Sequence, residues 1–378
     1  MAGPSNQQTK LFVLAAGGTG GHLFPAQALA EELVWRGNRV HLMTDERVRD
    51  YGKSFPAEAT HIVPSATITP SKPWLLPMQL LKLNRGIAAA KRILSEIRPH
   101  AVVGFGGYPS FPPILAASRL KIPSCIHDQN AVMGRANRFL ARWADAVASS
   151  FPELANLPAS AAKKLMFTGN PVRNIALAEK AAPYPPLAAD KPFKLLVFGG
   201  SQGARFFADF IPQLVAELPQ AVLKSLEIVQ QCRPEDMERV RAAFEGKGFS
   251  YELQPFFMDM PKRIAASHLV FCRAGASTIA ELGVIGRPAI MVPLPHALDN
   301  DQLRNAESFA KAGAGWVRPQ QSIDAKELAA FLTRLRYQDG ELAAASRAAL
   351  NHGKPDAAKR LADLAEQLAA RSAAKTET

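Results

Sequence analysis

The sequence predicts an α/β protein with two domains, each built on a parallel sheet, and three observations lead to this class. Short apolar runs alternate with helical stretches along all 378 residues, a length that exceeds one comfortable hydrophobic core. The same opening pattern of strand and glycine-rich turn occurs twice, as LFVLAAGGTGGH and as KLLVFGGSQGA. A proline-rich stretch at residues 181–191 separates these halves and is typical of a linker.

These patterns predict the domain boundaries. We expect a first Rossmann-like domain at residues 10–175, a linker at 176–192 and a second Rossmann-like domain at 193–354. An alanine-rich helix at 355–374 is long enough to leave the second domain and pack on the first. Two such domains facing each other across a cleft, each offering a phosphate-seeking turn, indicate nucleotide-linked chemistry between them.

Composition and charge narrow the partners and the compartment. Lys and Arg number 45 against 33 Asp and Glu, and the resulting net charge of +12 favours anionic partners, such as nucleic acid, an acidic lipid surface or a phosphorylated substrate. The three cysteines, Cys125, Cys232 and Cys272, predict neither a disulfide framework nor a metal cluster, and they suggest a reducing compartment. We expect a cytoplasmic protein, since the sequence shows neither a signal peptide nor a run of about 20 apolar residues.

Short apolar runs predict the strands of the first domain, at residues 10–14, 40–43, 101–103, 122–126, 146–149 and 165–167. The glycines after the first run let backbone approach a ligand closely, and the helix that follows directs its N–H groups at that ligand. The turn is out of register with the dinucleotide fingerprint G-x-G-x-x-G, and no clean acidic residue closes the next strand. A nicotinamide-dependent oxidoreductase is therefore the least favoured class.

Two groups of polar side chains in this domain are candidates for chemistry. His22 opens the helix after the glycine turn, where it is either a satisfied structural imidazole or a general base for a substrate hydroxyl. His127-Asp128-Gln129-Asn130 follows the predicted strand at 122–126. Ligands bind at the carboxyl ends of parallel strands, so we expect this tetrad to belong to a site.

The segment at residues 68–98 combines exposed-looking apolar side chains with cations. Its first part predicts contact with an anionic membrane, through Trp74, Leu75, Leu76, Lys72, Lys82 and Arg85. The alternative is an ordinary helix packed on the sheet. Part of the segment must pack in this way, since Ile87, Leu94 and Ile97 have the spacing of a buried face.

The second domain is predicted to contain strands at residues 194–198, 226–230, 251–254, 269–272 and 289–293. After the strand at 269–272, Ser277 and Thr278 can cap a helix whose free N–H groups favour a phosphate. Glu281 lies about one turn further along the helix, where its carboxylate can accept from both hydroxyls of a ribose. The alternative is that Ser277 is only a cap and Glu281 only part of a solvated helix face.

Seven motifs together carry a resemblance that covers residues 11–370, namely GGTGGHLFP, GFGGYPS, HDQNAVMGRANRFLA, TGNPVR, GGSQGAR, CRAGASTIAE and PLPHALDNDQLRNA. In this order they resemble glycosyltransferase family 28, whose members have the two-domain GT-B fold. The resemblance implies inverting transfer of N-acetylglucosamine (GlcNAc) from UDP-GlcNAc to the muramyl 4-hydroxyl of undecaprenyl-pyrophosphoryl-N-acetylmuramyl-pentapeptide (lipid I), forming lipid II in peptidoglycan synthesis. It also implies a peripheral position at the cytoplasmic face of the inner membrane, further wall-synthesis and division proteins as partners, and no nucleic acid.

The resemblance assigns site residues by position. It implies His22 and His127 as catalytic residues and Tyr108 on the acceptor side. Donor binding is implied for Thr19, Gly20, Gly21, Asn130, Arg173, Ser201, Gln202, Phe257, Arg273, Ser277, Thr278, Glu281, Gln302 and Asn305. Two positions depart from the family pattern, Asp128 where Glu is expected and Asp301 where His or Gln is usual.

We expect no cofactor and no obligatory metal. The first domain lacks an Asp-x-Asp motif, and Asp299-Asn300-Asp301, the one such spacing, falls in a motif that the family uses for the sugar. N–H groups at residues 199–204 and at the helix near Ser277 can stabilise the charge of a departing diphosphate in place of a cation.

Three further functions stay open at this stage. A sugar-nucleotide epimerase on the same plan would need extra acids in the cleft, and a glycosyltransferase with a soluble acceptor would have no use for the basic, apolar surface at 70–92. A non-catalytic scaffold of the wall-building machinery would retain the loops without turnover.

Overall fold

The structure, a computed structural model, describes residues 9–17, 20–46, 55–67, 72–188, 191–200, 203–295, 297–338 and 340–376. Three predicted site residues, Thr19, Ser201 and Gln202, lie outside these ranges. The chain divides into two compact units. Unit 1 comprises residues 1–174 and 355–378, and unit 2 comprises residues 175–354.

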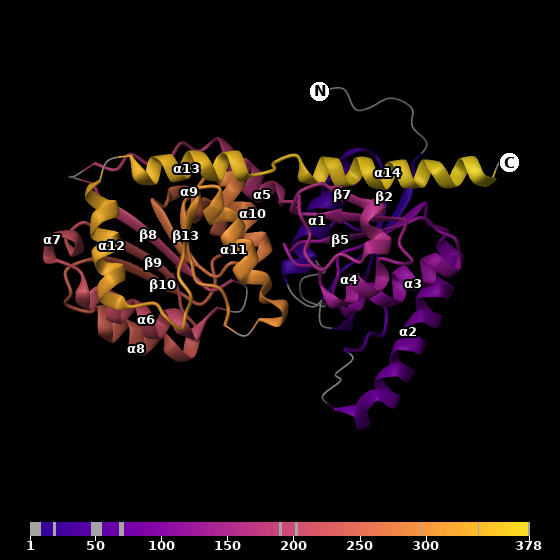
Figure 1. Cartoon of the computed structure of the whole chain (residues 1–378), viewed down its shortest axis with the longest axis horizontal. Helices are drawn as coiled ribbons and strands as arrows, with labels where there is room; N and C mark the ends of the chain where they lie inside the picture. Colours follow the sequence, from indigo (N-terminus) through magenta and orange to yellow (C-terminus); the bar gives the residue numbers. More distant parts are fainter. Residues whose placement is uncertain are drawn as a thin grey trace. The chain divides into compact units, whose positions relative to one another are not determined.

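Unit 1 is a parallel sheet of seven strands in the order β3-β2-β1-β4-β5-β6-β7 (Figure 1). The strands are β1 (Leu11–Ala15), β2 (Arg39–Thr44), β3 (Ala59–Ile62), β4 (Ala101–Gly104), β5 (Ser124–Asp128), β6 (Ala146–Ser149) and β7 (Leu165–Phe167). Its helices are α1 (Gly20–Trp35), α2 (Leu76–Ile97), α3 (Phe111–Arg119), α4 (Arg135–Leu140) and α14 (Ala357–Thr376), with short 3-10 turns η3 (Pro73–Leu75), η4 (Tyr108–Ser110) and η5 (Ala159–Lys164).

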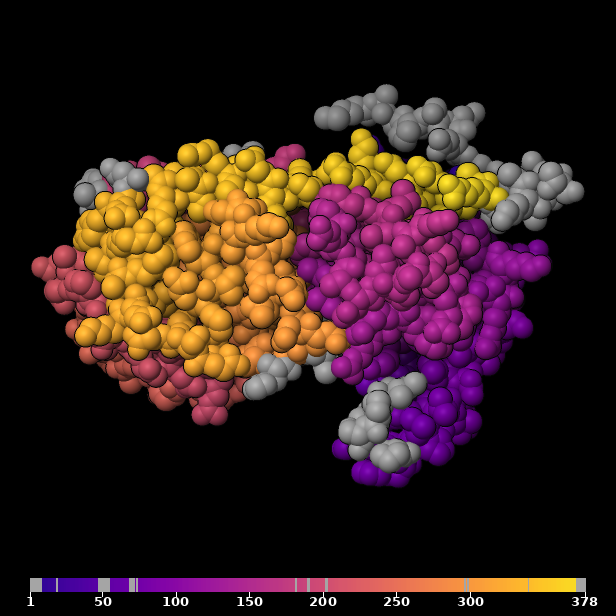
Figure 2. Space-filling model, in the orientation of Figure 1, coloured from indigo at the N-terminus to yellow at the C-terminus, as the bar shows by residue number. Residues whose placement is uncertain are grey.

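Both faces of this sheet are covered. Successive residues of β1 point to opposite faces of the sheet, and all five are apolar and buried. Phe12 and Leu14 pack with α1 and α14 on one face, while Val13 and Ala15 pack with α2 and α3 on the other. Helix α14 comes from the C-terminal end of the chain and lies along unit 1, as its yellow surface in Figure 2 shows. Its leucines Leu361, Leu364 and Leu368 join the first of these cores. Arg36, the residue after α1, forms ion pairs with Asp363 and Glu366 of α14 at 2.6 and 2.7 Å.

Unit 2 is a parallel sheet of six strands in the order β10-β9-β8-β11-β12-β13. The strands are β8 (Phe193–Phe198), β9 (Leu226–Gln231), β10 (Ser250–Gln254), β11 (Leu269–Cys272), β12 (Ala289–Met291) and β13 (Gly315–Val317). The helices are α5 (Asn174–Leu177), which starts at the boundary of the units, α6 (Arg205–Glu217), α7 (Gln220–Leu223), α8 (Met237–Phe244), α9 (Met260–Ala266), α10 (Ala276–Ile285), α11 (Asp301–Lys311), α12 (Ala325–Tyr337) and α13 (Glu341–His352), with η6 (Ala178–Ala181), η7 (Pro234–Asp236) and η8 (Leu298–Asn300).

The predicted α/β class with two Rossmann-like parallel sheets is confirmed. Two edge strands, β3 and β13, were not predicted, because each is short and neither forms an apolar run: β3 reads ATHI and β13 reads GWV. The strand predicted at 289–293 ends earlier, at Met291, before Pro293, which has no N–H to donate to a neighbouring strand.

Candidate functional site

The loops at the carboxyl end of the unit 1 sheet pack closely because they are built on glycine. A Cβ atom at Gly17, just after β1, would lie 2.9 Å from Oγ1 of Thr44 and 3.0 Å from Cγ of Pro109. Any side chain at this position would push apart the loops that follow β1, β2 and β4. The glycine turn therefore brings the start of α1 against the neighbouring loops, as the sequence pattern predicts.

His22 lies in the first turn of α1, half-buried, beside the loop that follows β4. Gly106 and Gly107 of that loop have φ angles of +80° and +68°, a region that side chains rarely adopt. A Cβ at Gly107 would stand 3.4 Å from Nε2 of His22. The other ring nitrogen, Nδ1, is 2.9 Å from Oε1 of Gln129. Glycine at position 107 thus leaves room on the Nε2 side of a ring that is held from its Nδ1 side.

His127 is fully buried at the end of β5, and both of its ring nitrogens are hydrogen-bonded. Its Nε2 is 3.0 Å from the carbonyl oxygen of Gly169, and its Nδ1 is 3.0 Å from Nε2 of Gln129. Burial lowers the pKa of His127 to about 4, so the ring is neutral at pH 7. Because the His127 ring is buried and both of its nitrogens are hydrogen-bonded within the protein, neither nitrogen is available to a substrate. The catalytic role that the resemblance implies for His127 therefore stays a prediction.

Asp128 shapes the loop between β5 and α4. Its buried carboxylate accepts from the backbone N–H of Gly134 at 2.9 Å and from Nδ2 of Asn137 at 2.9 Å, and burial raises its pKa. The backbone N–H of Asn130 donates to the same carboxylate at 3.3 Å. Asp128 thus acts on the loop that carries Asn130, which is a sufficient structural reason for an acid at this position.

The remaining predicted residues of unit 1 lie on neighbouring segments. Gly20 and Gly21 are the first residues of α1, and Tyr108 lies half-buried in η4. The guanidinium of Arg173 stacks 3.9 Å from the ring centre of Phe24, which also belongs to α1. Arg173 is therefore packed beside the same helix start as His22.

In unit 2, the loop from β8 to α6 depends on glycine still more strictly. A Cβ at Gly199 would lie 2.3 Å from the backbone nitrogen of Ala204, which no side chain tolerates. Gly200 and Gly203 have φ angles of +89° and +65°. The loop therefore folds back on itself directly before the N-terminus of α6, the arrangement that favours bound phosphate.

The helix after β11 begins differently from the prediction. Helix α10 starts at Ala276 with Gly275 as its N-cap, and no side chain caps it, so the expectation that Ser277 or Thr278 caps this helix is wrong. Both hydroxyls lie in the first turn instead. In the described part of the chain, the buried Oγ of Ser277 has no hydrogen-bond partner. The first turn of α10 thus offers free N–H groups and a hydroxyl to an anion.

Arg273 lies beneath this helix start and holds the neighbouring loop. Its guanidinium donates to the carbonyl oxygens of Val292 and Pro293, each at 3.1 Å, and to Oε1 of Gln320 at 2.7 Å. Burial lowers its pKa to about 10, which leaves it cationic at pH 7. These bonds place a positive charge behind the loops after β11 and β12.

The loop from β12 to α11 carries the predicted sugar residues. Asn305 is fully buried and donates from Nδ2 to the carbonyl oxygen of Ala274 at 3.1 Å, while Oε1 of Gln302 accepts from the N–H of Leu294 at 3.0 Å. Asp299 and Asn300 have consecutive φ angles of +64° and +53°, a conformation that costs about 1–3 kcal/mol per residue and that clusters at functional sites. His296, in the same motif, lies outside the described residues.

Two further predicted donor residues are buried in unit 2. Glu281 lies on α10, and its side chain is only 9% exposed, so the expectation of a solvated helix face is wrong. Phe257 follows β10 at 4% exposure, with the guanidinium of Arg263 stacked 4.2 Å from its ring centre. A buried, braced Phe257 side chain leaves only its backbone for a ligand.

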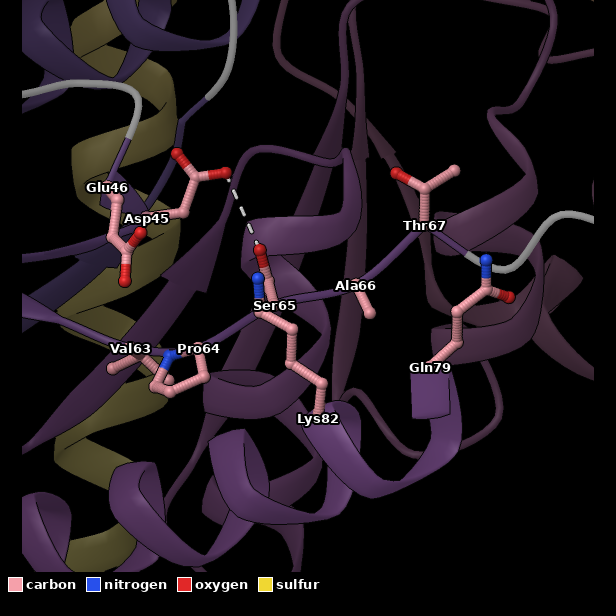
Figure 3. Close-up of a pocket in the computed structure, with 9 residues that line it drawn as sticks. All are labelled: Asp45, Glu46, Val63, Pro64, Ser65, Ala66, Thr67, Gln79 and Lys82. Atoms are coloured by element: carbon pink, nitrogen blue, oxygen red, sulfur yellow. Dashed lines mark hydrogen bonds between the residues drawn. The ribbon is translucent and has the colours of Figure 1, made fainter. Parts of the chain in front are cut away.

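A polar cavity of about 340 Å³ lies at the carboxyl ends of β2 and β3 (Figure 3). Its lining includes Asp45, Glu46, Ser65, Gln79 and Lys82, and Ser65 Oγ is 3.5 Å from Oδ2 of Asp45. The sequence pattern does not predict this cavity, because no glycine motif or polar cluster marks its lining and only Lys82 was named, for membrane contact.

Known protein families match the sequences of both units. The family model for the glycosyltransferase family 28 N-terminal domain matches residues 12–149, and that for the family's C-terminal domain matches residues 194–361. A protein of Rhizobium meliloti (strain 1021) is 50% identical over 362 residues, which cover 96% of each chain. One of Mesorhizobium japonicum is 49% identical over 359 residues, 95% of each chain. Both are named UDP-N-acetylglucosamine--N-acetylmuramyl-(pentapeptide) pyrophosphoryl-undecaprenol N-acetylglucosamine transferase.

Solved structures show the same architecture. The crystal structure of Acinetobacter baumannii MurG matches with a TM-score of 0.75 at 30% identity, covering 95% of this chain and 99% of that one. A putative UDP-N-acetylglucosamine 2-epimerase from Listeria monocytogenes matches with a TM-score of 0.68 at 15% identity, covering 98% of both chains. The second likeness concerns the fold alone, so fold by itself does not separate transferase from epimerase.

Proposed function

Because this chain belongs to glycosyltransferase family 28, we propose that it transfers GlcNAc from UDP-GlcNAc to the muramyl 4-hydroxyl of lipid I, with inversion, to form lipid II. The observation that carries this proposal is the 50% identity, over 96% of both chains, to a relative whose name states that reaction. The site geometry supplies independent support. In unit 1, His22 is held at Nδ1 and has its Nε2 beside Gly107, and in unit 2 a glycine loop precedes the N-terminus of α6, an arrangement that favours a bound anion.

The proposed step is a single displacement. The acceptor hydroxyl attacks the anomeric carbon, the bond to the diphosphate breaks on the opposite face, and Nε2 of His22 takes the hydroxyl proton. Negative charge then grows on the departing UDP. We propose that N–H groups of the loop at 199–204 and of the first turn of α10, with the Ser277 hydroxyl, stabilise this charge. We propose that these groups suffice without a metal or other cofactor.

The remaining donor contacts are proposed by position. Glu281 would accept from the ribose, the backbone of Phe257 would contact uracil, and Arg173 and Arg273 would lie near the nucleotide. Gln302, Asn305 and Asn130 would contact the sugar, and Tyr108 would border the acceptor. The bonds of Gln302 and Asn305 to neighbouring backbone support this assignment because they hold both side chains in place.

Incubation with labelled UDP-GlcNAc and a lipid I analogue tests the function. We expect a disaccharide-lipid product, formed equally well with a chelator present. An epimerase would alter or release the sugar without the lipid, a soluble-acceptor enzyme would glycosylate a small molecule, and a scaffold would bind donor without turnover. Any of these results in place of the lipid product would refute the proposal.

We also propose that the protein binds the cytoplasmic face of the inner membrane peripherally. The basic apolar surface is defined by exposed and half-buried side chains of η3, the residue before it and α2, whose path Figure 1 shows. It comprises the predicted Lys72, Trp74, Leu75, Leu76, Lys82 and Arg85, together with Met78, Leu80 and Leu81. Trp74 is 71% exposed and Met78 is 64% exposed. Exposing such large apolar side chains to water is unfavourable, and clusters of them mark surfaces that bind a partner or a membrane. Among the helices that the structure describes, none is long and apolar enough to cross a bilayer.

Replacing Lys82 and Arg85 together with Gln should weaken binding to anionic vesicles by roughly 30-fold, since each cation near such a surface contributes about 1 kcal/mol. Vesicle sedimentation measures this. The matched control is Lys224→Gln with Lys311→Gln, which removes two exposed cations from unit 2 and should leave vesicle binding unchanged. Equal loss in both double variants would mean that total charge, not this surface, sets binding.

A further inference from the structure

A buried relay of hydrogen bonds links His22 to the backbone at Gly169. Nδ1 of His22 lies 2.9 Å from Oε1 of Gln129, and Nε2 of Gln129 lies 3.0 Å from Nδ1 of His127. Nε2 of His127 lies 3.0 Å from the carbonyl oxygen of Gly169. Gln129 is 3% exposed and His127 is 0% exposed, so water does not substitute for these bonds.

The donor and the acceptor of each hydrogen bond in the relay can be assigned from the Gly169 carbonyl, which stands at one end of the relay. The Gly169 carbonyl only accepts, so Nε2 of His127 carries the proton and its Nδ1, in the neutral ring, is an acceptor. The Gln129 amide must therefore turn its NH₂ toward His127. Its oxygen then faces His22, whose Nδ1 must donate. A neutral His22 is left with a bare lone pair on Nε2, the nitrogen beside Gly107.

The opposite orientation of the amide is excluded by a second bond. The same NH₂ of Gln129 donates to the backbone carbonyl of His127 at 3.1 Å. A flipped amide would place its oxygen against that carbonyl and against the lone pair on Nδ1 of His127. Both contacts would be repulsive in a buried site. The amide orientation is thus fixed by two acceptors, independently of His22.

We propose that Gln129 is a positioning residue that holds His22 in the tautomer with a free Nε2, the form that can take a proton from a substrate hydroxyl. This inference rests on the proposed transferase function, because it gives that function's base its reactive nitrogen. The relay starts from the Gly169 carbonyl, 42 residues from His127 and 147 residues from His22 in the chain. The proton position on His22 in α1 therefore depends on a carbonyl of the segment that follows β7.

His127 and Asp128 are two titratable groups that interact electrostatically with His22. His127 stays neutral over the working range because burial lowers its pKa to about 4. Asp128 is held by the N–H of Gly134 and by Nδ2 of Asn137 and does not bond to His22. Gln129 is thus the side chain whose replacement alters the tautomer without adding or removing a charge.

Two variants of Gln129 separate the relay from simple packing. Gln129→Met keeps the approximate volume but neither accepts from nor donates to a ring nitrogen. We expect kcat to fall by about 100-fold, with the Kd of UDP-GlcNAc unchanged within about twofold. Gln129→Glu with a protonated carboxyl keeps both contacts, because its O–H can donate to Nδ1 of His127 and its other oxygen can accept from Nδ1–H of His22. It should therefore retain more activity than Gln129→Met, at a pH low enough to keep this carboxyl protonated.

If Gln129 only filled space, Gln129→Met would be more active than Gln129→Glu, since a buried site tolerates an apolar Met better than a polar carboxyl group. Nitrogen-15 NMR of the histidine rings supplies a readout that needs no turnover. In the wild type and in Gln129→Glu, Nε2 of His22 should show the shift of an unprotonated nitrogen. In Gln129→Met it should move toward that of an N–H, because a free neutral histidine prefers its proton on Nε2.

The matched control is Gln27→Met, on α1 like His22, where the amide donates to Oε1 of Glu31 at 3.0 Å. It should leave kcat, the pH profile and the NMR signal of His22 unchanged. If Gln129→Met kept the wild-type His22 signal, or were more active than Gln129→Glu, the relay would be disproved. If the NMR result held but no variant, wild type included, formed lipid product, the proposed function would fail and the tautomer assignment would stand.

Discussion

Replacing His22 with Ala is expected to lower kcat by about 10²–10⁴-fold, the range that a positioned general base contributes. The reason is that Nδ1 of His22 is held by Gln129, while Nε2 lies beside Gly107, which has no side chain to cover it. Donor affinity should stay within about twofold, because His22 is not among the proposed donor contacts, most of which come from unit 2. Steady-state transfer to a lipid I analogue and titration of UDP-GlcNAc measure the two quantities.

His61→Ala is the control for this variant. His61 is on the edge strand β3 of the same unit, and its Nε2 pairs with Nδ1 of His41 at 3.1 Å, so its loss should leave kcat unchanged. Near-normal turnover in His22→Ala would remove His22 from the mechanism. A parallel loss of donor affinity would instead mean that the variant damages binding rather than proton transfer.

Gly199→Ala is expected to weaken UDP-GlcNAc binding by about 100-fold, or about 2.8 kcal/mol at 1.4 kcal/mol per tenfold change. The added Cβ would lie 2.3 Å from the backbone nitrogen of Ala204 and 2.6 Å from its Cβ, so the loop before α6 must move. Overpacking against backbone of this kind costs typically 1–3 kcal/mol even where no ligand is bound. Calorimetric titration measures the affinity, and thermal unfolding measures the stability.

The comparison variant is Gly246→Ala, also in unit 2. Gly246 has a φ angle of +72°, and a Cβ atom added there would meet nothing within 4 Å among the described residues, so this change adds backbone strain without a clash. We expect a modest loss of stability and unchanged donor affinity. If Gly199→Ala bound donor as tightly as Gly246→Ala, the loop at 199–204 would not be the phosphate seat.

Much of the fold was predictable because its signals are local. Apolar runs such as Leu269–Cys272 and Ala146–Ser149 are strands in the structure at the predicted residues. The glycine turns at 17 and 199 proved to be places where no Cβ fits, which is the physical reason that glycine occurs there. The edge strands β3 and β13 escaped prediction, since an edge strand contacts one neighbour and does not require an apolar run.

The candidate site was predictable in outline but not in its roles. Polar residues after buried strands pointed to His127 and its neighbours, while the family resemblance implied that His127 is a catalytic residue. The structure buries its ring and engages both nitrogens, because the segment after β7 places a carbonyl against it. In the same way, Ser277 matched a cap by composition, while Gly275 takes the N-cap position and leaves the hydroxyl inside the first turn.

The sequence by itself determined the class, most strand and turn positions, the family and the residue types of the site, since each depends on side chains close together in the chain. Tertiary structure alone decided that α14 packs on unit 1 and that Gln129 stands between two histidines. His22 and Gln129 are 107 residues apart, and His127 and Gly169 are 42 residues apart. Hydrogen bonds are short-ranged and directional, so which nitrogen carries a proton is set by the atoms that folding brings within about 3 Å of it.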